Sequence, residues 1–221
     1  MDTAAMKREQ TSLLAPLEKR ALLWLAHRMP QWVNSDHLTL LGFIAMFAAG
    51  LGYWAARSHP QALVWVSAAL VVNWFGDSLD GTLARVRNRQ RPRYGFYVDH
   101  MTDAIGTAFL LGGLALSGFM SAAVAVTLLI VYLLLSIQSY LATYARGTFQ
   151  LSFWKFSPTE LRVLLIAGNI ALLLRGPLAR LAGMDFLLFD VGGVIGIIGM
   201  TAILIVSSIR NTAALYRDER I

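Results

Sequence analysis

The chain has 221 residues, of which 57% are apolar and only 14% carry a charged side chain. An ordinary soluble domain is about 45–50% apolar and about 25% charged, so this composition excludes intrinsic disorder and is typical of an integral membrane protein. The chain contains no cysteine, which excludes disulfide-stabilised folds, thiol catalysis and thiolate metal sites. Its net charge is +6, and in a membrane protein such an excess more often faces the cytoplasm and anionic lipid than nucleic acid.

Residues 12–29 predict an amphipathic helix near the N-terminus. Leu14, Leu17, Ala21, Trp24 and Leu25 form its apolar face, and its charged residues project elsewhere. A helix of this kind lies in the membrane interface, and a soluble helix in an N-terminal tail is the alternative. We therefore divide the chain into a cytoplasmic N-terminal segment, residues 1–30, and a membrane domain, residues 31–221.

Hydrophobic segments make up most of the remaining chain. Residues 104–145 carry no Asp, Glu, Lys or Arg and are long enough to cross a bilayer twice, with a turn at Ser117 and Gly118. The pattern predicts an all-α, polytopic membrane protein with six transmembrane helices. The expected segments are residues 37–56, 62–85, 95–116, 121–145, 159–175 and 187–208.

The distribution of positive charge predicts the orientation of these six segments. Sixteen of the 19 Lys and Arg residues fall on one side, and only Arg57, Arg175 and Arg180 fall on the other. Because positive residues stay on the cytoplasmic side, both termini are expected there.

Four acidic residues lie inside the predicted second and third segments: Asp77, Asp80, Asp99 and Asp103. A carboxylate at the centre of a bilayer costs about 2.5–3.5 kcal/mol on insertion scales, so four of them indicate a function, most often cation binding. Protonated or helix-pairing carboxylates are the structural alternative.

Helical spacing predicts that these carboxylates meet. Asp77 and Asp80 are three residues apart, and Asp99 and Asp103 are four apart, so each pair shares one helix face. Asp77 and Asp103 each lie eight residues from the cytoplasmic end of their segment, which is about 12 Å. A cavity open to the cytoplasm would then hold hard divalent cations, Mg²⁺ or Mn²⁺, and four carboxylates suffice for two ions about 3.5–4 Å apart.

The run Asp77-Ser-Leu-Asp80-Gly81-Thr-Leu-Ala84-Arg85, followed by Gly95-Phe-Tyr-Val-Asp99-His-Met-Thr-Asp103, resembles the signature of the CDP-alcohol phosphatidyltransferase family, with all eight signature positions filled. The resemblance implies that Asp77, Asp80 and Asp99 hold the two metal ions. It also implies that Asp103 contacts the second ion and acts as the general base. The positions that the family uses for the CDP-linked donor are Asp77, Gly81, Ala84, Arg85 and Gly95.

Candidates for the acceptor site are Arg146, Lys155 and His100. Family members with a phosphorylated acceptor use basic residues near Arg146 and Lys155, although membrane topology alone also explains these charges. His100 directly after Asp99, and the run that includes Leu38, Thr39 and Gly42, are similar to the choline/ethanolamine phosphotransferase branch. A histidine in a helix interface is the structural alternative for His100.

The resemblance implies an enzyme of phospholipid biosynthesis with its active site facing the cytoplasm. It would transfer a phosphatidyl or phosphobase group from a CDP-linked donor to a hydroxyl acceptor, a small alcohol or diacylglycerol, and release CMP. The implied partners are membrane lipid and a second copy of the chain in a homodimer. Nucleic acid is not an expected partner. The alternatives are a UbiA-like Mg²⁺-dependent prenyltransferase, which needs more spans and a second motif, and a divalent-cation transporter, which needs acidic residues along a path across the membrane.

Overall fold

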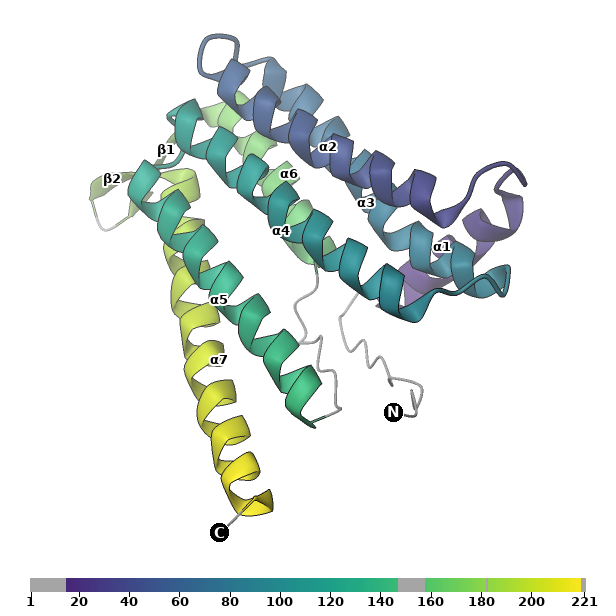
Figure 1. Cartoon of the computed structure of the whole chain (residues 1–221). Helices are drawn as coiled ribbons and strands as arrows, with labels where there is room; N and C mark the ends of the chain where they lie inside the picture. Colours follow the sequence, from purple (N-terminus) through teal and green to yellow (C-terminus); the bar gives the residue numbers. More distant parts are fainter. Residues whose placement is uncertain (1–14, 147–157, 182, 220–221) are drawn as a thin grey trace.

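The computed structural model describes residues 15–146, 158–181 and 183–219. Within these ranges the chain forms seven α-helices and one two-stranded antiparallel sheet (Figure 1). The predicted all-α class is confirmed, and the short hairpin is an addition that the sequence pattern did not predict. The elements are α1 (Ala15–Arg28), α2 (Ser35–Ala56), α3 (Ala62–Val86), α4 (Pro92–Ser117), α5 (Ala122–Arg146), α6 (Pro158–Arg175), β1 (Leu178–Leu181), β2 (Met184–Leu187) and α7 (Leu188–Asp218).

Each of the six predicted hydrophobic segments forms a helix, and short local signals explain where some of these helices begin and end. Asn34 caps α2, because its side-chain Oδ1 accepts a hydrogen bond of 2.9 Å from the backbone N–H of His37. Pro92 stands in the first turn of α4, where its missing N–H costs nothing. Gly118 ends α4 in a left-handed conformation with φ of 81°, as the predicted turn requires.

Helix α2 packs between α3 and α4 at very short distance (Figure 1). A Cβ atom added at Gly76 of α3 would lie 2.7 Å from the backbone nitrogen of Gly42 in α2. A Cβ added at Gly113 of α4 would overlap the backbone carbonyl of Gly50 in α2. Small residues at these crossings let the three backbones approach closely, and this arrangement brings the acidic faces of α3 and α4 together.

Buried apolar residues form two separate clusters. The larger cluster joins α2, α3, α4, α5, α6 and α7, and it includes Tyr53, Leu70 and Leu114. The smaller cluster fixes α1 on α3 and includes Leu22, Ala26 and Leu83. The acidic residues belong to neither cluster.

Helix α1 lies within the predicted N-terminal helix. Of the predicted apolar face, Leu25 is half-buried against the smaller cluster, and Ala21 and Trp24 are exposed. Leu22 and Ala26 are buried against α3, and Glu18 on the same side of the helix accepts hydrogen bonds from Trp74 and Ser78 of α3. Residues 12–14 of the predicted helix lie outside the described residues.

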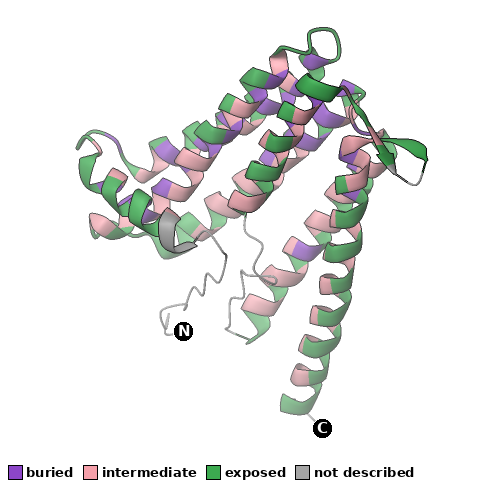
Figure 2. Cartoon of the chain, turned by 180° about the vertical axis from the view of Figure 1, so that it is seen from behind, coloured by how far each residue is buried: buried purple, intermediate pink, exposed green. Residues whose placement is uncertain are grey.

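Helices α5 and α7 run side by side and diverge from the other helices toward their C-terminal ends (Figure 1). They are joined at their start, where Asp190 of α7 accepts a hydrogen bond of 2.7 Å from the backbone N–H of Ser121, just before α5. The hairpin precedes α7 and places Arg180 opposite Asp185. Nearly all residues of α5 and α7 are exposed or half-buried (Figure 2), as expected for helices that face lipid.

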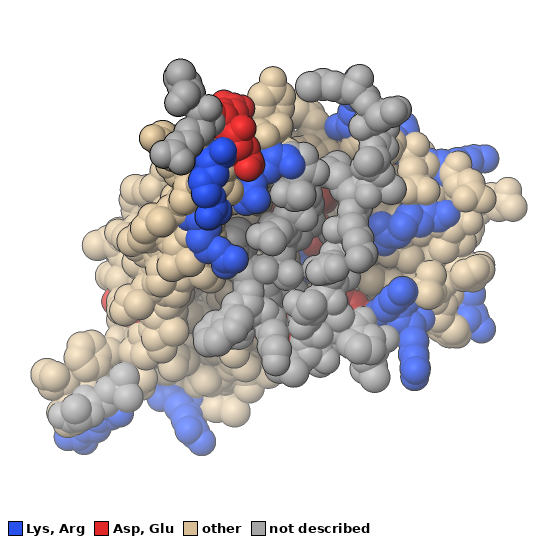
Figure 3. Space-filling model, turned by 90° about the horizontal axis from the view of Figure 1, so that it is seen from below, with Lys and Arg blue, Asp and Glu red and all other residues tan. Residues whose placement is uncertain are grey.

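Among the described residues, four helices are long and apolar enough to cross a membrane: α2, α3, α5 and α7. Polar side chains at Asp99, His100 and Asp103 interrupt the apolar sequence of α4, and α6 carries three charged residues. Lys and Arg side chains surround the face seen from below, the side toward which α5 and α7 extend (Figure 3). The chain is therefore an integral membrane protein by composition and helix length.

Candidate active site

The structure brings the predicted acidic residues of α3 and α4 to one small cavity beside α2. Asp77 and Asp80 of α3 and Asp103 of α4 line it, and Asp99 stands one turn before Asp103 on the same helix. The four carboxylates are close enough to act on one another electrostatically. The complete lining is Thr39, Gly42, Phe43, Met46, Asn73, Asp77, Asp80, Thr102 and Asp103.

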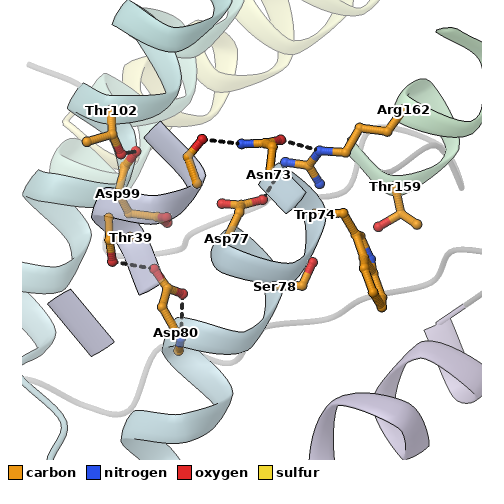
Figure 4. A network of polar contacts seen from close by, with 12 residues as sticks. Thr39, Asn73, Trp74, Asp77, Ser78, Asp80, Asp99, Thr102, Thr159 and Arg162 are labelled. Carbon is orange, nitrogen blue, oxygen red and sulfur yellow. Dashed lines mark hydrogen bonds and ion pairs between the residues drawn. The ribbon is translucent and has the colours of Figure 1, made fainter. Parts of the chain in front are cut away.

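Asp80 is held mainly by the first turns of α2. The hydroxyl of Thr39 donates a hydrogen bond of 2.6 Å to Asp80 Oδ2 (Figure 4). The hydroxyl of Ser35 donates to the backbone carbonyl of Asp80 at 2.5 Å, and the backbone N–H of Gly81 donates to Asp80 Oδ1. The orientation of this carboxylate is thus fixed from two helices.

Asp77 is held from α6. The Arg162 guanidinium donates through Nη2 to Asp77 Oδ2 at 2.5 Å, and through Nε to the side-chain oxygen of Asn73 at 2.7 Å (Figure 4). Asn73 in turn donates from Nδ2 to the backbone carbonyl of Gly42 at 3.0 Å. A continuous polar chain therefore runs from α2 through α3 to α6.

Asp99 and Asp103 form a group with the intervening His100. One ligand atom of each residue lies within 4.8 Å of the other two. The imidazole of His100 is stacked on the Tyr140 ring of α5 at 4.7 Å and packs edge-on against Phe96 at 4.2 Å. His100 therefore also serves the contact between α4 and α5.

Apart from Asp77, the predicted donor-binding residues lie toward the C-terminal end of α3 and at the N-terminal end of α4. Gly81 and Ala84 are half-buried and Arg85 is exposed, with its guanidinium donating to the Thr82 hydroxyl at 3.0 Å. Gly95 is exposed and has open space where a side chain would begin. Small residues next to an arginine leave room for a phosphate-bearing ligand, which a guanidinium can bind with two parallel hydrogen bonds.

The predicted acceptor residues are not all brought to this cavity. Arg146 lies at the end of α5 and donates to the side-chain oxygen of Asn211 in α7 at 2.7 Å. It lines a second, basic cavity with Arg210 and Arg217 of α7. Lys155 lies outside the described residues.

The carboxylates fit a divalent cation. Carboxylate oxygens are the ligands that Mg²⁺ and Mn²⁺ prefer, and here three carboxylates line one cavity while Asp99 is grouped with Asp103 and His100. Embedded carboxylates without a cation would be costly in a membrane.

Three residues that contact this site were not predicted from the sequence: Thr39, Asn73 as a partner of Arg162, and Arg162 itself. Arg162 was counted as a cytoplasmic charge, yet it lies within α6, one turn after Pro158. A charge inside a hydrophobic segment is the same signal that identified the aspartates, and it could have identified Arg162 as well.

Comparison with known proteins is consistent with this geometry. The sequence model of the CDP-alcohol phosphatidyltransferase family matches residues 32–208, which is most of the chain. An archaetidylinositol phosphate synthase from Methanothermobacter thermautotrophicus is 30% identical over 104 residues, which are 47% of this chain and 49% of the relative. The similarity thus spans about half the length of that curated relative.

Proposed function

Because the chain belongs to the CDP-alcohol phosphatidyltransferase family, we propose that it is an integral-membrane phosphotransferase of phospholipid biosynthesis. It transfers a phosphoalcohol group from a CDP-linked donor to a hydroxyl acceptor and releases CMP. The observation that carries this proposal is the cavity that Asp77, Asp80 and Asp103 line beside Asp99. The family match favours this function over the prenyltransferase and the cation transporter.

Asp77, Asp80, Asp99 and Asp103 would hold two divalent ions, Mg²⁺ or Mn²⁺. When bound, such ions neutralise the donor diphosphate and stabilise the charge that gathers on the departing CMP. Support comes from the donor set, from the partial burial of the carboxylates and from the family signature. Gly81, Ala84, Arg85 and Gly95 would then form the site of the CDP group, together with Asp77.

Asp103 would act as the general base. The acceptor hydroxyl oxygen forms a bond to the phosphorus that carries the alcohol, the bond from that phosphorus to the CMP oxygen breaks, and the hydroxyl proton passes to Asp103. Asp103 lines the cavity, so its carboxylate can reach a hydroxyl bound there. Asp103→Asn should therefore keep the donor bound and abolish turnover, and CMP release at the wild-type rate would contradict the assignment.

A phosphorylated small alcohol is the first acceptor to test. The relative's name describes the synthesis of archaetidylinositol phosphate, and Arg146, Arg210 and Arg217 surround a cavity whose charge suits a phosphate. Lys155 and His100 remain further candidates for contact with the acceptor. Diacylglycerol is the alternative acceptor, and it would need no basic cavity.

The proposed arrangement in the membrane has six spans, formed by α2 to α7, with both termini and the active site on the cytoplasmic side. Residues 1–30 would be the cytoplasmic segment with an interfacial helix, and residues 31–221 the membrane domain. Support comes from the apolar helices and from the concentration of Lys and Arg on one side. The enzyme would act as a homodimer, as its family resemblance implies.

A CMP-release assay tests the proposed function. The purified chain is placed in lipid nanodiscs with Mg²⁺ or Mn²⁺ and a panel of CDP-linked donors, each offered inositol phosphate, glycerol phosphate, free inositol or diacylglycerol. We expect CMP only when a divalent ion, one donor and one acceptor are all present, and no CMP from Asp103→Asn. Failure of every pair to release CMP in a correctly folded, metal-loaded sample would contradict the proposal.

A further inference from the structure

Arg162 and Asp77 form an ion pair that is largely removed from solvent. The Arg162 side chain is 11% exposed and the Asp77 side chain is 22% exposed. The pair joins a helix outside the family signature, α6, to the first aspartate of the signature on α3. A surface contact of this kind would contribute little, whereas a buried one fixes the geometry of both partners.

The guanidinium is held at two points. Asn73 and Asp77 are four residues apart on one face of α3, and Arg162 binds both with different nitrogen atoms. Asn73 is only 4% exposed and is itself anchored to the backbone of α2. A planar guanidinium suits such a fork, because its donors point in fixed directions, whereas a lysine ammonium is a single point charge.

Asp77 takes part in two contacts at once. Oδ2 accepts the hydrogen bond from Arg162, while the same carboxylate lines the acidic cavity. In many metal sites a neighbouring residue forms a hydrogen bond to a metal-ligating side chain and fixes the orientation of that side chain. Loss of the neighbouring residue typically weakens metal affinity about 10–100-fold.

We propose that Arg162 is a positioning residue that orients Asp77 toward the divalent ion, with Asn73 as the anchor of its guanidinium. The inference rests on the proposed metal site. The proposal also predicts a direction of change in metal affinity that is opposite to the direction expected from charge alone. A positive charge beside a cation site repels the cation, so removing that charge should strengthen metal binding if orientation did not matter. If Arg162 positions Asp77, removing it weakens binding instead.

The experiment is a Mn²⁺ titration of the purified full chain, read from the EPR signal of free Mn²⁺ and requiring neither donor nor acceptor. Arg162→Gln should raise the Kd about 10–100-fold. Arg162→Lys keeps the charge but cannot bridge Asn73 and Asp77, so it should also raise the Kd. Arg175→Gln is the matched control, since Arg175 is an exposed arginine at the other end of α6, and it should leave the Kd unchanged.

A double-mutant cycle shows whether Arg162 acts through Asp77. In an Asp77→Asn background, Arg162→Gln should cause no further loss of Mn²⁺ affinity. An equal loss in both backgrounds would overturn the inference, as would an unchanged or tighter Kd in Arg162→Gln alone. An unchanged or tighter Mn²⁺ Kd in Arg162→Gln, together with a raised KM for a phosphorylated acceptor, would place Arg162 in the acceptor site.

The melting temperature of each variant, measured without metal, identifies variants that fail to fold. If Arg162→Gln is unfolded, Arg162→Lys carries the test, because it preserves the charge and most of the side-chain volume. A wild-type chain that binds no Mn²⁺ would contradict the proposed function itself. Mn²⁺ binding that is insensitive to both Arg162 variants would contradict only the present inference.

Discussion

The Thr39 hydroxyl of α2 donates a 2.6 Å hydrogen bond to the Asp80 carboxylate of α3, from a helix that carries none of the signature aspartates. Thr39 lines the same cavity as Asp77, Asp80 and Asp103. Helix α2 therefore contributes directly to the acidic site and does not merely separate α3 from α4.

Replacing Thr39 by valine should weaken divalent-metal binding without unfolding the chain. Valine keeps the branched shape but removes the donor, and a hydrogen bond to a charged group contributes about 1.5–3 kcal/mol. We expect the Mn²⁺ Kd to rise about tenfold or more. Thr143→Val is the control, because the Thr143 hydroxyl donates only within its own helix, to the Ser139 carbonyl. Equal Kd values for both variants would contradict this role of Thr39.

Adjacent glycines in α4 should respond very differently to alanine. Gly113 is buried against the backbone of Gly50, and a Cβ atom added at Gly113 would have no space. Gly112 is exposed, and a Cβ atom added there would meet open space. Gly113→Ala should force α2 and α4 apart and lower the melting temperature strongly. Gly112→Ala should be neutral or stabilising, since alanine favours a helix by about 0.5–1 kcal/mol over glycine. Thermal unfolding in detergent measures both, and similar melting temperatures would argue against the close crossing.

The Glu18 carboxylate should be essential for fixing α1. Its Oε1 accepts hydrogen bonds from Trp74 Nε1 at 2.9 Å, from the Ser78 hydroxyl at 3.3 Å and from the Thr159 hydroxyl at 2.8 Å. These donors lie together beside the acidic site (Figure 4). Glu18→Ala removes the shared acceptor of these part-buried donors, and a fully buried donor left unsatisfied would cost about 1–3 kcal/mol, so the loss here should lie toward the lower end.

Glu18→Gln is the matched control for this prediction, because glutamine retains a side-chain oxygen in the same position. Thermal unfolding should therefore rank wild type, Glu18→Gln and Glu18→Ala in descending order of stability. Limited proteolysis should cut α1 first in Glu18→Ala. The prediction fails if alanine and glutamine give the same melting temperature as the wild type.

The absence of native cysteines allows a direct test of membrane orientation. Gln90 lies in the connection between α3 and α4, and His59 lies in the connection between α2 and α3; both are exposed. In inverted and right-side-out vesicles, a membrane-impermeant maleimide should label Gln90→Cys only from the cytoplasmic side and His59→Cys only from the other. Labelling of both from one side would exclude the proposed arrangement.

Hydrophobicity predicted the helices well. The apolar runs are long, the predicted turn at Gly118 ends α4, and side-chain period alone places Asp77 with Asp80 and Asp99 with Asp103. The common cavity was predicted because Asp77 and Asp103 lie at the same distance from the ends of their hydrophobic segments. These features depend on residues that are close in sequence.

Contacts between distant residues were harder to predict. The hydrogen bonds that Glu18 of α1 accepts from three donors on other helices were not predicted. Arg162 was assigned by its side of the membrane, although its partner Asp77 is 85 residues away. The β1–β2 hairpin depends on a left-handed Gly183 with φ of 83° and on a short pairing that gives little periodicity.

The most direct test of the central claim is the anomalous diffraction of crystals grown with Mn²⁺ and CMP. The account predicts two manganese peaks among the carboxylates of Asp77, Asp80, Asp99 and Asp103, with the CMP phosphate beside them on the side of Arg85. Crystals in which CMP is bound but no manganese peak lies among these carboxylates would contradict it.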